Sequence, residues 1–106
     1  MTKNTKKIDT ALIGCGYWGT NIAKSLIAIK RTIYVYDQNQ NNCKILKKRF
    51  SNFINIEKNL SNIVVNKRIK NVILATPPSK NFKLFKIFIK NKKNIFIEKP
   101  GLKNLK

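Results

Sequence analysis

Three glycines form the most chemically informative motif of the chain, Gly14-Cys-Gly-Tyr-Trp-Gly19. A G-x-G-x-x-G run carries chemical meaning where it joins a strand to a helix. Gly14 then permits a tight turn, Gly16 lets the backbone approach a ligand, and Gly19 lets the helix pack closely. The N–H groups and positive dipole end of such a helix start suit a doubly anionic diphosphate. Tyr17 and Trp18 lie in the same run, and we expect both to contact that ligand. The alternatives are a turn that merely needs glycines and a tryptophan that packs over the sheet.

Asp37 is the acidic residue that this interpretation requires. A carboxylate about 20 residues beyond the glycine motif, at a strand end, accepts hydrogen bonds from the adenosine ribose in dinucleotide-binding proteins. Asp37 follows the apolar run 32–36 and matches that position. It favours NAD, because the phosphate on the 2' oxygen of NADP would be repelled. NADP stays open as an alternative because three lysines follow closely: Lys44, Lys47 and Lys48. The other interpretation of Asp37 is an ordinary solvated strand end.

The surrounding pattern predicts the elements that would position these residues. Short runs rich in Ile, Val, Phe and Tyr alternate with longer Lys-bearing segments, as in a parallel sheet connected by helices. We expect an α/β, Rossmann-like, doubly wound parallel sheet of about five strands with flanking helices. The expected strands are 9–14, 32–37, 53–56, 71–75 and 94–98.

The expected helices come from apolar residues at helical spacing between these strands. The first covers 18–30, with an apolar face of Ile22, Ala23, Leu26, Ile27 and Ile29. The second and third are marked by the apolar residues within 43–50 and 60–64. For the fourth we expect a buried stripe of Phe82, Phe85, Phe88 and Ile89.

Composition limits the classes of partner. The chain has 106 residues, which suits one domain. Its formal net charge of +19 is typical of nucleic-acid binders. However, it has 20 lysines and only 3 arginines, whereas a specific nucleic-acid site favours arginine. We therefore attribute the charge to a bias towards Lys, Asn and Ile, whose codons are A/T-rich. Nucleic acid is not the expected partner.

Membrane, metal and redox signals are weak. No apolar stretch approaches the roughly 20 residues that cross a bilayer, and no secretion signal is evident. Cys15 and Cys43 lie far apart in the sequence, without C-x-x-C spacing. This pattern predicts no metal site, no disulfide framework and a cytoplasmic location.

The chain resembles the Gfo/Idh/MocA oxidoreductases over nearly its whole length. Three segments carry the resemblance, and they lie at the ends of the first, fourth and fifth expected strands: 11–19 with Asn21, Ala75-Thr-Pro-Pro78 and Glu98-Lys-Pro100. The resemblance implies that Thr76 and Pro77 line the cofactor groove. It also implies that Glu98 and Lys99 approach the nicotinamide, where Lys99 positions substrate and assists proton transfer. Outside this motif, Lys99 would be one more solvated lysine.

The implied activity is hydride transfer between NAD(P) and a CH–OH carbon of a sugar, nucleotide sugar or cyclitol. The Tyr17-Trp18-Gly19 form of the loop resembles the branch that oxidises nucleotide-linked sugars. The chain departs from the family in two respects: it lacks the family's second domain, and Asn81 stands where the family usually has histidine. We therefore expect residues 1–106 to be a dinucleotide-binding domain, incomplete at its C-terminal end, without the substrate and oligomerisation domain. Such a chain would be inactive unless another polypeptide supplies that domain. A free-standing nucleotide-binding module and a basic nucleic-acid-binding protein are the alternatives.

Overall fold

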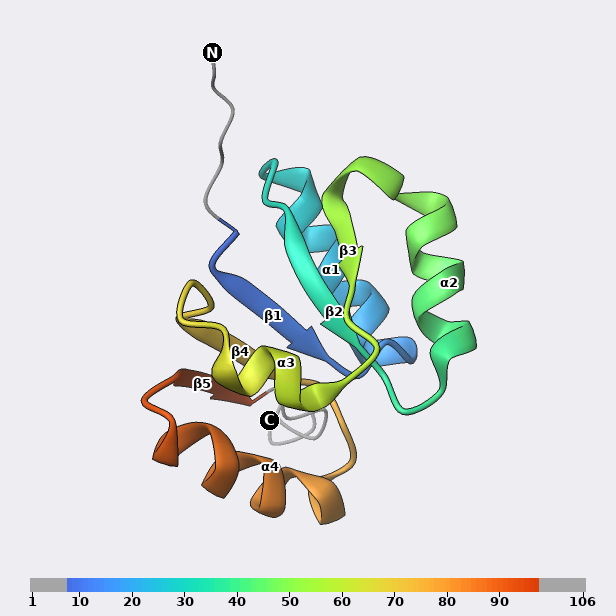
Figure 1. The fold of residues 1–106 in the computed structure, drawn as a ribbon. Helices are drawn as coiled ribbons and strands as arrows, with labels where there is room; N and C mark the ends of the chain where they lie inside the picture. The colour runs from blue at the N-terminus through green and yellow to red at the C-terminus, as the bar shows by residue number, and fades with distance from the viewer. Residues whose placement is uncertain (1–7, 98–106) are drawn as a thin grey trace, which may run out of the picture.

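The fold is a five-stranded, all-parallel sheet with helices on both faces, seen in a computed structural model that describes residues 8–97 (Figure 1). The strands are β1 (Thr10–Ile13), β2 (Ile33–Tyr36), β3 (Ile54–Ile56), β4 (Asn71–Leu74) and β5 (Asn94–Ile97). Their order in the sheet is β3-β2-β1-β4-β5. The chain therefore builds β2 and β3 on one side of β1, and then β4 and β5 on the other side of β1. This reversal places a crevice at the carboxyl ends of β1 and β4, where open α/β sheets bind ligands. The predicted fold class is confirmed.

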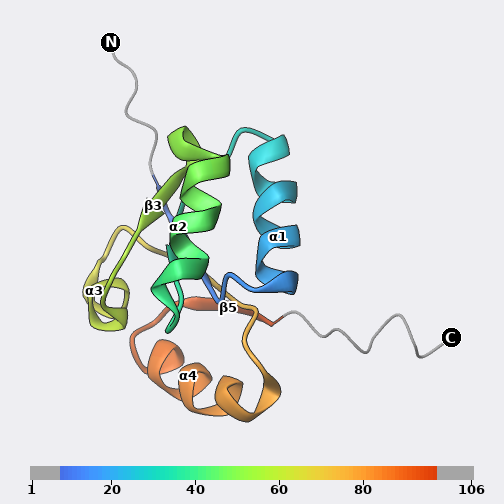
Figure 2. The same cartoon turned by 90° about the vertical axis from the view of Figure 1, so that its right-hand side faces the viewer.

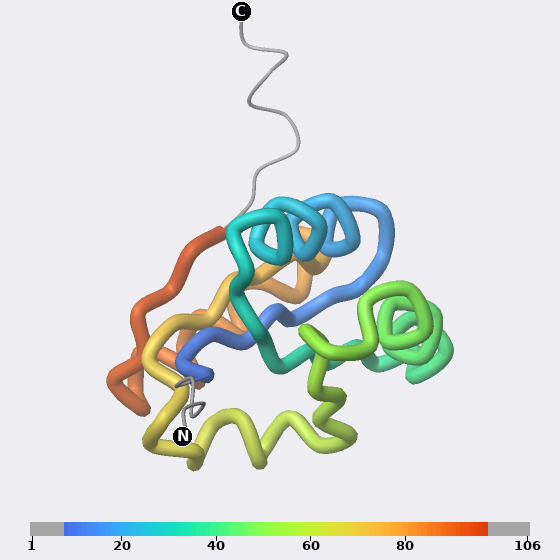
Figure 3. The backbone as a smooth tube through the Cα atoms, turned by 90° about the horizontal axis from the view of Figure 1, so that it is seen from above, coloured from blue at the N-terminus to red at the C-terminus, as the bar shows by residue number. Residues whose placement is uncertain are grey.

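Helices lie on both faces of the sheet (Figures 2 and 3). Two hydrophobic cores, one on each face, hold them to it. The helices are α1 (Tyr17–Ala28), α2 (Gln40–Arg49), α3 (Leu60–Val65) and α4 (Pro78–Lys90). Side chains alternate along β1, so that Leu12 packs under α1 and α2 while Ala11 and Ile13 pack under α3 and α4. All four residues of β1 are buried, as expected for the central strand of such a sheet. Within residues 8–97, no helix is long and apolar enough to cross a membrane.

The start of α2 lies earlier than the apolar pattern indicates. The polar run after β2 is its cap and first turn, because the Asn39 side chain accepts a hydrogen bond from the Asn41 N–H at 3.0 Å. Asparagine is a favoured N-cap residue, since its oxygen satisfies an N–H that has no partner within the helix. At the other helix, Ile29 is exposed because α1 ends at Ala28, so its assignment to the buried face was wrong.

The predicted buried stripe of α4 was wrong for three of its four members. Phe88 is fully buried, but Phe82 is 71% exposed, and Phe85 and Ile89 are also exposed. The inward side of the helix carries Asn81 and Leu84 in addition to Phe88. The helix has apolar residues on more than one face, so spacing alone does not tell which one meets the sheet. The packing of Leu84 and Phe88 in the core under the sheet decides which face is buried.

Lys93 connects two turns at the amino-terminal edge of the sheet. Its Nζ donates hydrogen bonds to the carbonyls of Asn66 at 2.7 Å and Ile69 at 2.8 Å. Burial lowers the pKa of Lys93, and the neighbouring Lys70 lowers it further. The charged form of Lys93 is therefore less favourable in the folded chain than in the unfolded chain. Its two hydrogen bonds still stabilise the turns.

We expect Lys93→Met to lower the free energy of unfolding by about 1–3 kcal/mol at neutral pH, because two carbonyls lose a donor. The deficit should grow as the pH rises towards the ordinary lysine pKa. In that range the unfolded wild type binds more protons than the folded form, so wild-type stability rises with pH. Urea denaturation of both proteins at neutral and alkaline pH measures the difference. A deficit that shrinks with increasing pH would contradict this account.

Candidate functional site

The turn after β1 is built on Gly14, which has a φ of +102°. This is a backbone conformation that residues with a side chain rarely adopt. A Cβ at Gly14 would also lie 2.8 Å from the carbonyl oxygen of Ala75, at the end of β4. The Gly14 N–H donates to the carbonyl of Tyr36 at 2.8 Å. The turn is thus held tightly between the ends of β2 and β4.

Gly19 and Gly16 have opposite surroundings. A Cβ at Gly19 would lie 1.8 Å from the carbonyl oxygen of Gly14, so α1 can approach the turn only without a side chain there. A Cβ at Gly16 would meet nothing within 4 Å. Gly16 is the N-cap residue of α1 and no side chain caps the helix. The start of α1 therefore faces open space, as an anion site at a helix N-terminus requires.

Asp37 lies beside this turn, directly after β2. Its Oδ2 accepts hydrogen bonds from the Cys15 N–H at 2.7 Å and from Asn42 Nδ2 at 3.2 Å. Its Oδ1 accepts one from the Asn39 N–H at 2.8 Å. The carboxylate thereby joins the glycine turn to the start of α2. An ionised carboxylate has about four acceptor positions, so three are filled by the chain and one stays available on Oδ1.

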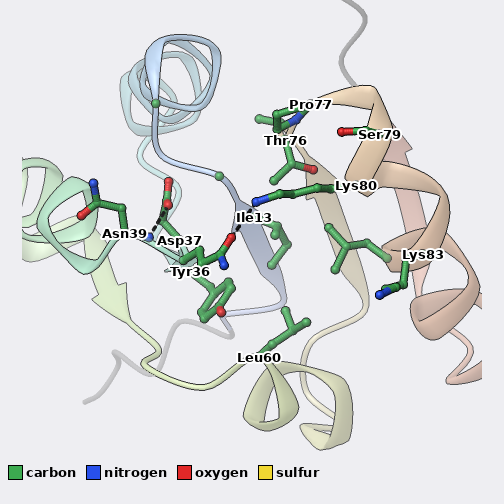
Figure 4. Close-up of a pocket in the computed structure, with 15 residues that line it drawn as sticks. Ile13, Tyr36, Asp37, Asn39, Leu60, Thr76, Pro77, Ser79, Lys80 and Lys83 are labelled. Carbon is green, nitrogen blue, oxygen red and sulfur yellow. Dashed lines mark hydrogen bonds between the residues drawn. The ribbon is translucent and has the colours of Figure 1, made fainter.

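A groove of about 750 Å³ runs along the carboxyl ends of β1, β2 and β4 (Figure 4). Five of the residues predicted for the cofactor site line it: Gly14, Gly16, Asp37, Thr76 and Pro77. Tyr17 and Trp18 are not among the lining residues. Tyr17 is 77% exposed, packs edge-on against Trp18, and borders a smaller hollow between α1 and α2. Glu98 and Lys99 lie outside the described residues. Sequence reasoning missed several lining residues, including Gln38, Leu60 and Lys80.

Asn81 fixes the loop that follows β4. Thr76 Oγ1 donates a hydrogen bond to Asn81 Oδ1, and the Asn81 N–H donates to the carbonyl of Pro77 at 3.2 Å. The Asn81 side chain is buried. The Asn81 side chain is therefore a polar acceptor that orients Thr76 in the groove wall.

Replacing Asn81 with leucine should lower the free energy of unfolding by about 1–3 kcal/mol, because the Thr76 hydroxyl loses its acceptor. Asn62→Leu is the matched control, since that exposed amide donates to Glu57 at 3.0 Å; its effect should stay within about 0.5 kcal/mol. Thermal or urea denaturation measures both. Equal stability of Asn81→Leu and wild type would show that Asn81 does not hold the loop.

The lysines that line the groove are not the three that follow Asp37 in the sequence. Lys47 Nζ donates to the carbonyls of Ser51 at 2.9 Å and Ile54 at 2.6 Å, and neither Lys44 nor Lys48 lines the groove. Two lysines from α4 line it instead, Lys80 and Lys83. They reach the site because β4 and α4 lie beside β1, which no local pattern reveals.

Cys15 and Cys43 are distant in sequence but meet under the glycine turn, with 3.9 Å between their sulfur atoms. Both are buried and neither is in a disulfide. The hydrogen bond to Cys43, together with burial, raises the pKa of the Cys15 thiol, and the same bond lowers the pKa of Cys43. Cys15 therefore keeps its proton at neutral pH, and the geometry allows either thiol to be the donor. Residues 8–97 contain no group of three or more metal-ligating side chains.

These features together define a dinucleotide-binding Rossmann domain. The residues present fit the cofactor: the space at Gly16 is open where a diphosphate would approach α1, and Asp37 keeps one acceptor position for a ribose hydroxyl. The crevice lies at the reversal of strand order, as the fold requires.

The comparison with protein families identifies the particular family. Residues 8–106 match the model of the Gfo/Idh/MocA oxidoreductase family, described as an NAD-binding Rossmann fold. The chain belongs to this family and contains its NAD-binding domain. The predicted family and the predicted cofactor NAD are confirmed. No curated protein matches the chain.

Solved structures with the same fold include GenD2, GnnA and KijD10. GenD2 from gentamicin A biosynthesis, in complex with NAD, is 22% identical with a TM-score of 0.74, covering 94% of this chain and 30% of that one. UDP-N-acetylglucosamine 3-dehydrogenase GnnA from Acidithiobacillus ferrooxidans is 21% identical, with a TM-score of 0.75 and coverages of 91% and 31%. KijD10, a 3-ketoreductase from Actinomadura kijaniata in complex with NADP and TDP-benzene, is 15% identical, with a TM-score of 0.75 and coverages of 90% and 30%. The chain thus spans about three-tenths of the length of each.

Proposed function

We propose that the chain is the cofactor-binding part of an enzyme that transfers hydride between NAD and a CH–OH carbon of a sugar, nucleotide sugar or cyclitol. The observation that carries the proposal is the groove in which the open N-terminus of α1 lies beside the Asp37 carboxylate. Family membership supports the reaction class. The names of the structural neighbours, which include a UDP-sugar dehydrogenase and a 3-ketoreductase, support the substrate class.

The residues of the chain have separate tasks in this proposal. The backbone N–H groups at the start of α1 bind the diphosphate, because Gly16 leaves their approach open. Asp37 accepts a hydrogen bond from the adenosine ribose on Oδ1, while its other contacts keep the carboxylate oriented. Thr76, fixed by Asn81, and Pro77 form the opposite wall. The nicotinamide ring supplies the redox chemistry when bound.

Proton transfer is assigned to Lys99 in this proposal. General acid–base chemistry near neutral pH usually uses histidine or a lysine of lowered pKa, and the chain contains no histidine. Lys99 would position the substrate hydroxyl and take its proton, with Glu98 beside the nicotinamide. Both roles rest on the resemblance of Glu98-Lys-Pro100 to the family motif. The cytoplasmic location stays a prediction as well.

Turnover should require a substrate-binding part that lies outside these 106 residues, since the chain spans about three-tenths of its structural neighbours. We expect the purified chain to bind NAD without reducing it when UDP-sugars or myo-inositol are added. Equilibrium dialysis measures binding, and the absorbance of NADH measures reduction. NADH formation by the chain alone would overturn the need for a further part. Absence of NAD binding would overturn the proposal itself.

A further inference from the structure

Lys80 spans the groove from the wall opposite Asp37. It projects from the first turn of α4, and its Nζ donates to Gln38 Oε1 at 2.6 Å. Figure 4 shows the side chain reaching across the groove towards the Asp37 side. Gln38 directly follows Asp37, so the ammonium group of Lys80 is held next to the place where the adenosine ribose would bind.

The charge balance at this end of the groove differs from the one that Asp37 alone would produce. Among the described residues that line it, the charged ones are Asp37, Lys80 and Lys83. Three donors from the chain already face the Asp37 carboxylate: the N–H groups of Cys15 and Asn39, and the Asn42 amide. The repulsion that usually excludes an additional phosphate beside such an aspartate is therefore weakened.

We propose that Lys80 is a specificity-determining residue that lets the domain accept NADP as well as NAD, by pairing with the phosphate on the 2' oxygen of the adenosine ribose. A cation near the acidic residue is the usual means of accommodating this phosphate. Here the cation comes from α4, across the groove, and not from the lysines that follow Asp37 in the sequence. The hydrogen bond to Gln38 is exposed, so Lys80 gives it up at little cost. This inference rests on the proposed function.

The test compares NADH and NADPH binding to wild type, Lys80→Met and Lys90→Met, followed by nicotinamide fluorescence at one fixed ionic strength. Lys90 is the matched control, because it lies at the far end of the same helix, is exposed, and does not line the groove. Both variants lose one positive charge from a strongly basic chain. Any difference in dinucleotide affinity between the two variants therefore comes from the position of the lost charge.

We expect wild type to bind NADPH with an affinity within about tenfold of that for NADH. Lys80→Met should lose about tenfold in NADPH affinity, while its NADH affinity changes less than about twofold. Lys90→Met should change both by less than about twofold. Competition by adenosine 2',5'-bisphosphate should weaken in Lys80→Met, whereas competition by AMP should not.

Two results would overturn the inference and leave the proposed function intact. One is NADPH binding to wild type more than about a hundredfold weaker than NADH binding. The other is an equal change, or no change, in the two affinities on replacing Lys80. Failure of wild type to bind either dinucleotide would instead overturn the proposed function.

Discussion

Gly19→Ala is expected to prevent folding, or to lower the free energy of unfolding by more than about 4 kcal/mol. The added Cβ would lie 1.8 Å from the carbonyl oxygen of Gly14. Neither partner can yield, since Gly14 is itself fixed at positive φ against Ala75 and α1 begins just before Gly19. Circular dichroism and urea denaturation of the purified variant measure the loss.

Gly16→Ala is the matched control for this experiment. It adds the same methyl group to the same turn, but the new Cβ meets nothing within 4 Å and the backbone is in the extended region. Its stability should remain within about 0.5 kcal/mol of wild type. If Gly19→Ala were as stable as Gly16→Ala, the close approach of α1 to the turn would be wrong.

Asp37→Ala should reduce the affinity for NADH by about 10- to 100-fold, which corresponds to one hydrogen bond to a charged group. The affinity for NADPH should fall less, because the variant also removes a negative charge near the additional phosphate. Stability should fall too, since the Cys15 N–H and the cap of α2 lose their acceptor. Titration under native conditions, with denaturation as a separate measurement, separates the two effects.

Asp9→Ala is the control for Asp37→Ala. Asp9 lies just before β1, at the opposite end of the sheet, and pairs with Arg31 at 2.6 Å. Its removal makes the same change in net charge and should leave both affinities within about twofold. Equal losses of NADH and NADPH affinity in Asp37→Ala would count against a ribose contact by Asp37.

Local sequence patterns predicted the strands and helices well, because each of them is marked by residues within its own segment. β1 and β2 are short apolar runs, the glycine turn joins a strand to a helix, and Pro77-Pro78 follows the end of β4. Asp37 could be selected because its distance from Gly19 follows from a strand–helix–strand unit of ordinary length. These features depend on residues close together in the sequence.

The parts that were missed depend on contacts between distant segments. Which face of α4 is buried depends on its packing against β4 and β5, because apolar residues lie on more than one of its faces, so Phe82 was wrongly expected inside. The Lys80–Gln38 contact requires the ends of β2 and β4 to face each other across β1. The meeting of the two cysteines likewise arises where the turn after β1 packs on α2.

The central claim is that a nicotinamide dinucleotide binds with its diphosphate against the start of α1. Its most direct test is a titration of wild type and Gly16→Val with NADH, read by nicotinamide fluorescence. A Cβ at position 16 would meet nothing within 4 Å, and the valine methyl groups beyond it would occupy the open approach to the helix. Saturable binding by wild type and a loss of about tenfold or more in Gly16→Val, at unchanged unfolding midpoint, is the predicted result. Equal binding by the two proteins, or none by wild type, would contradict it.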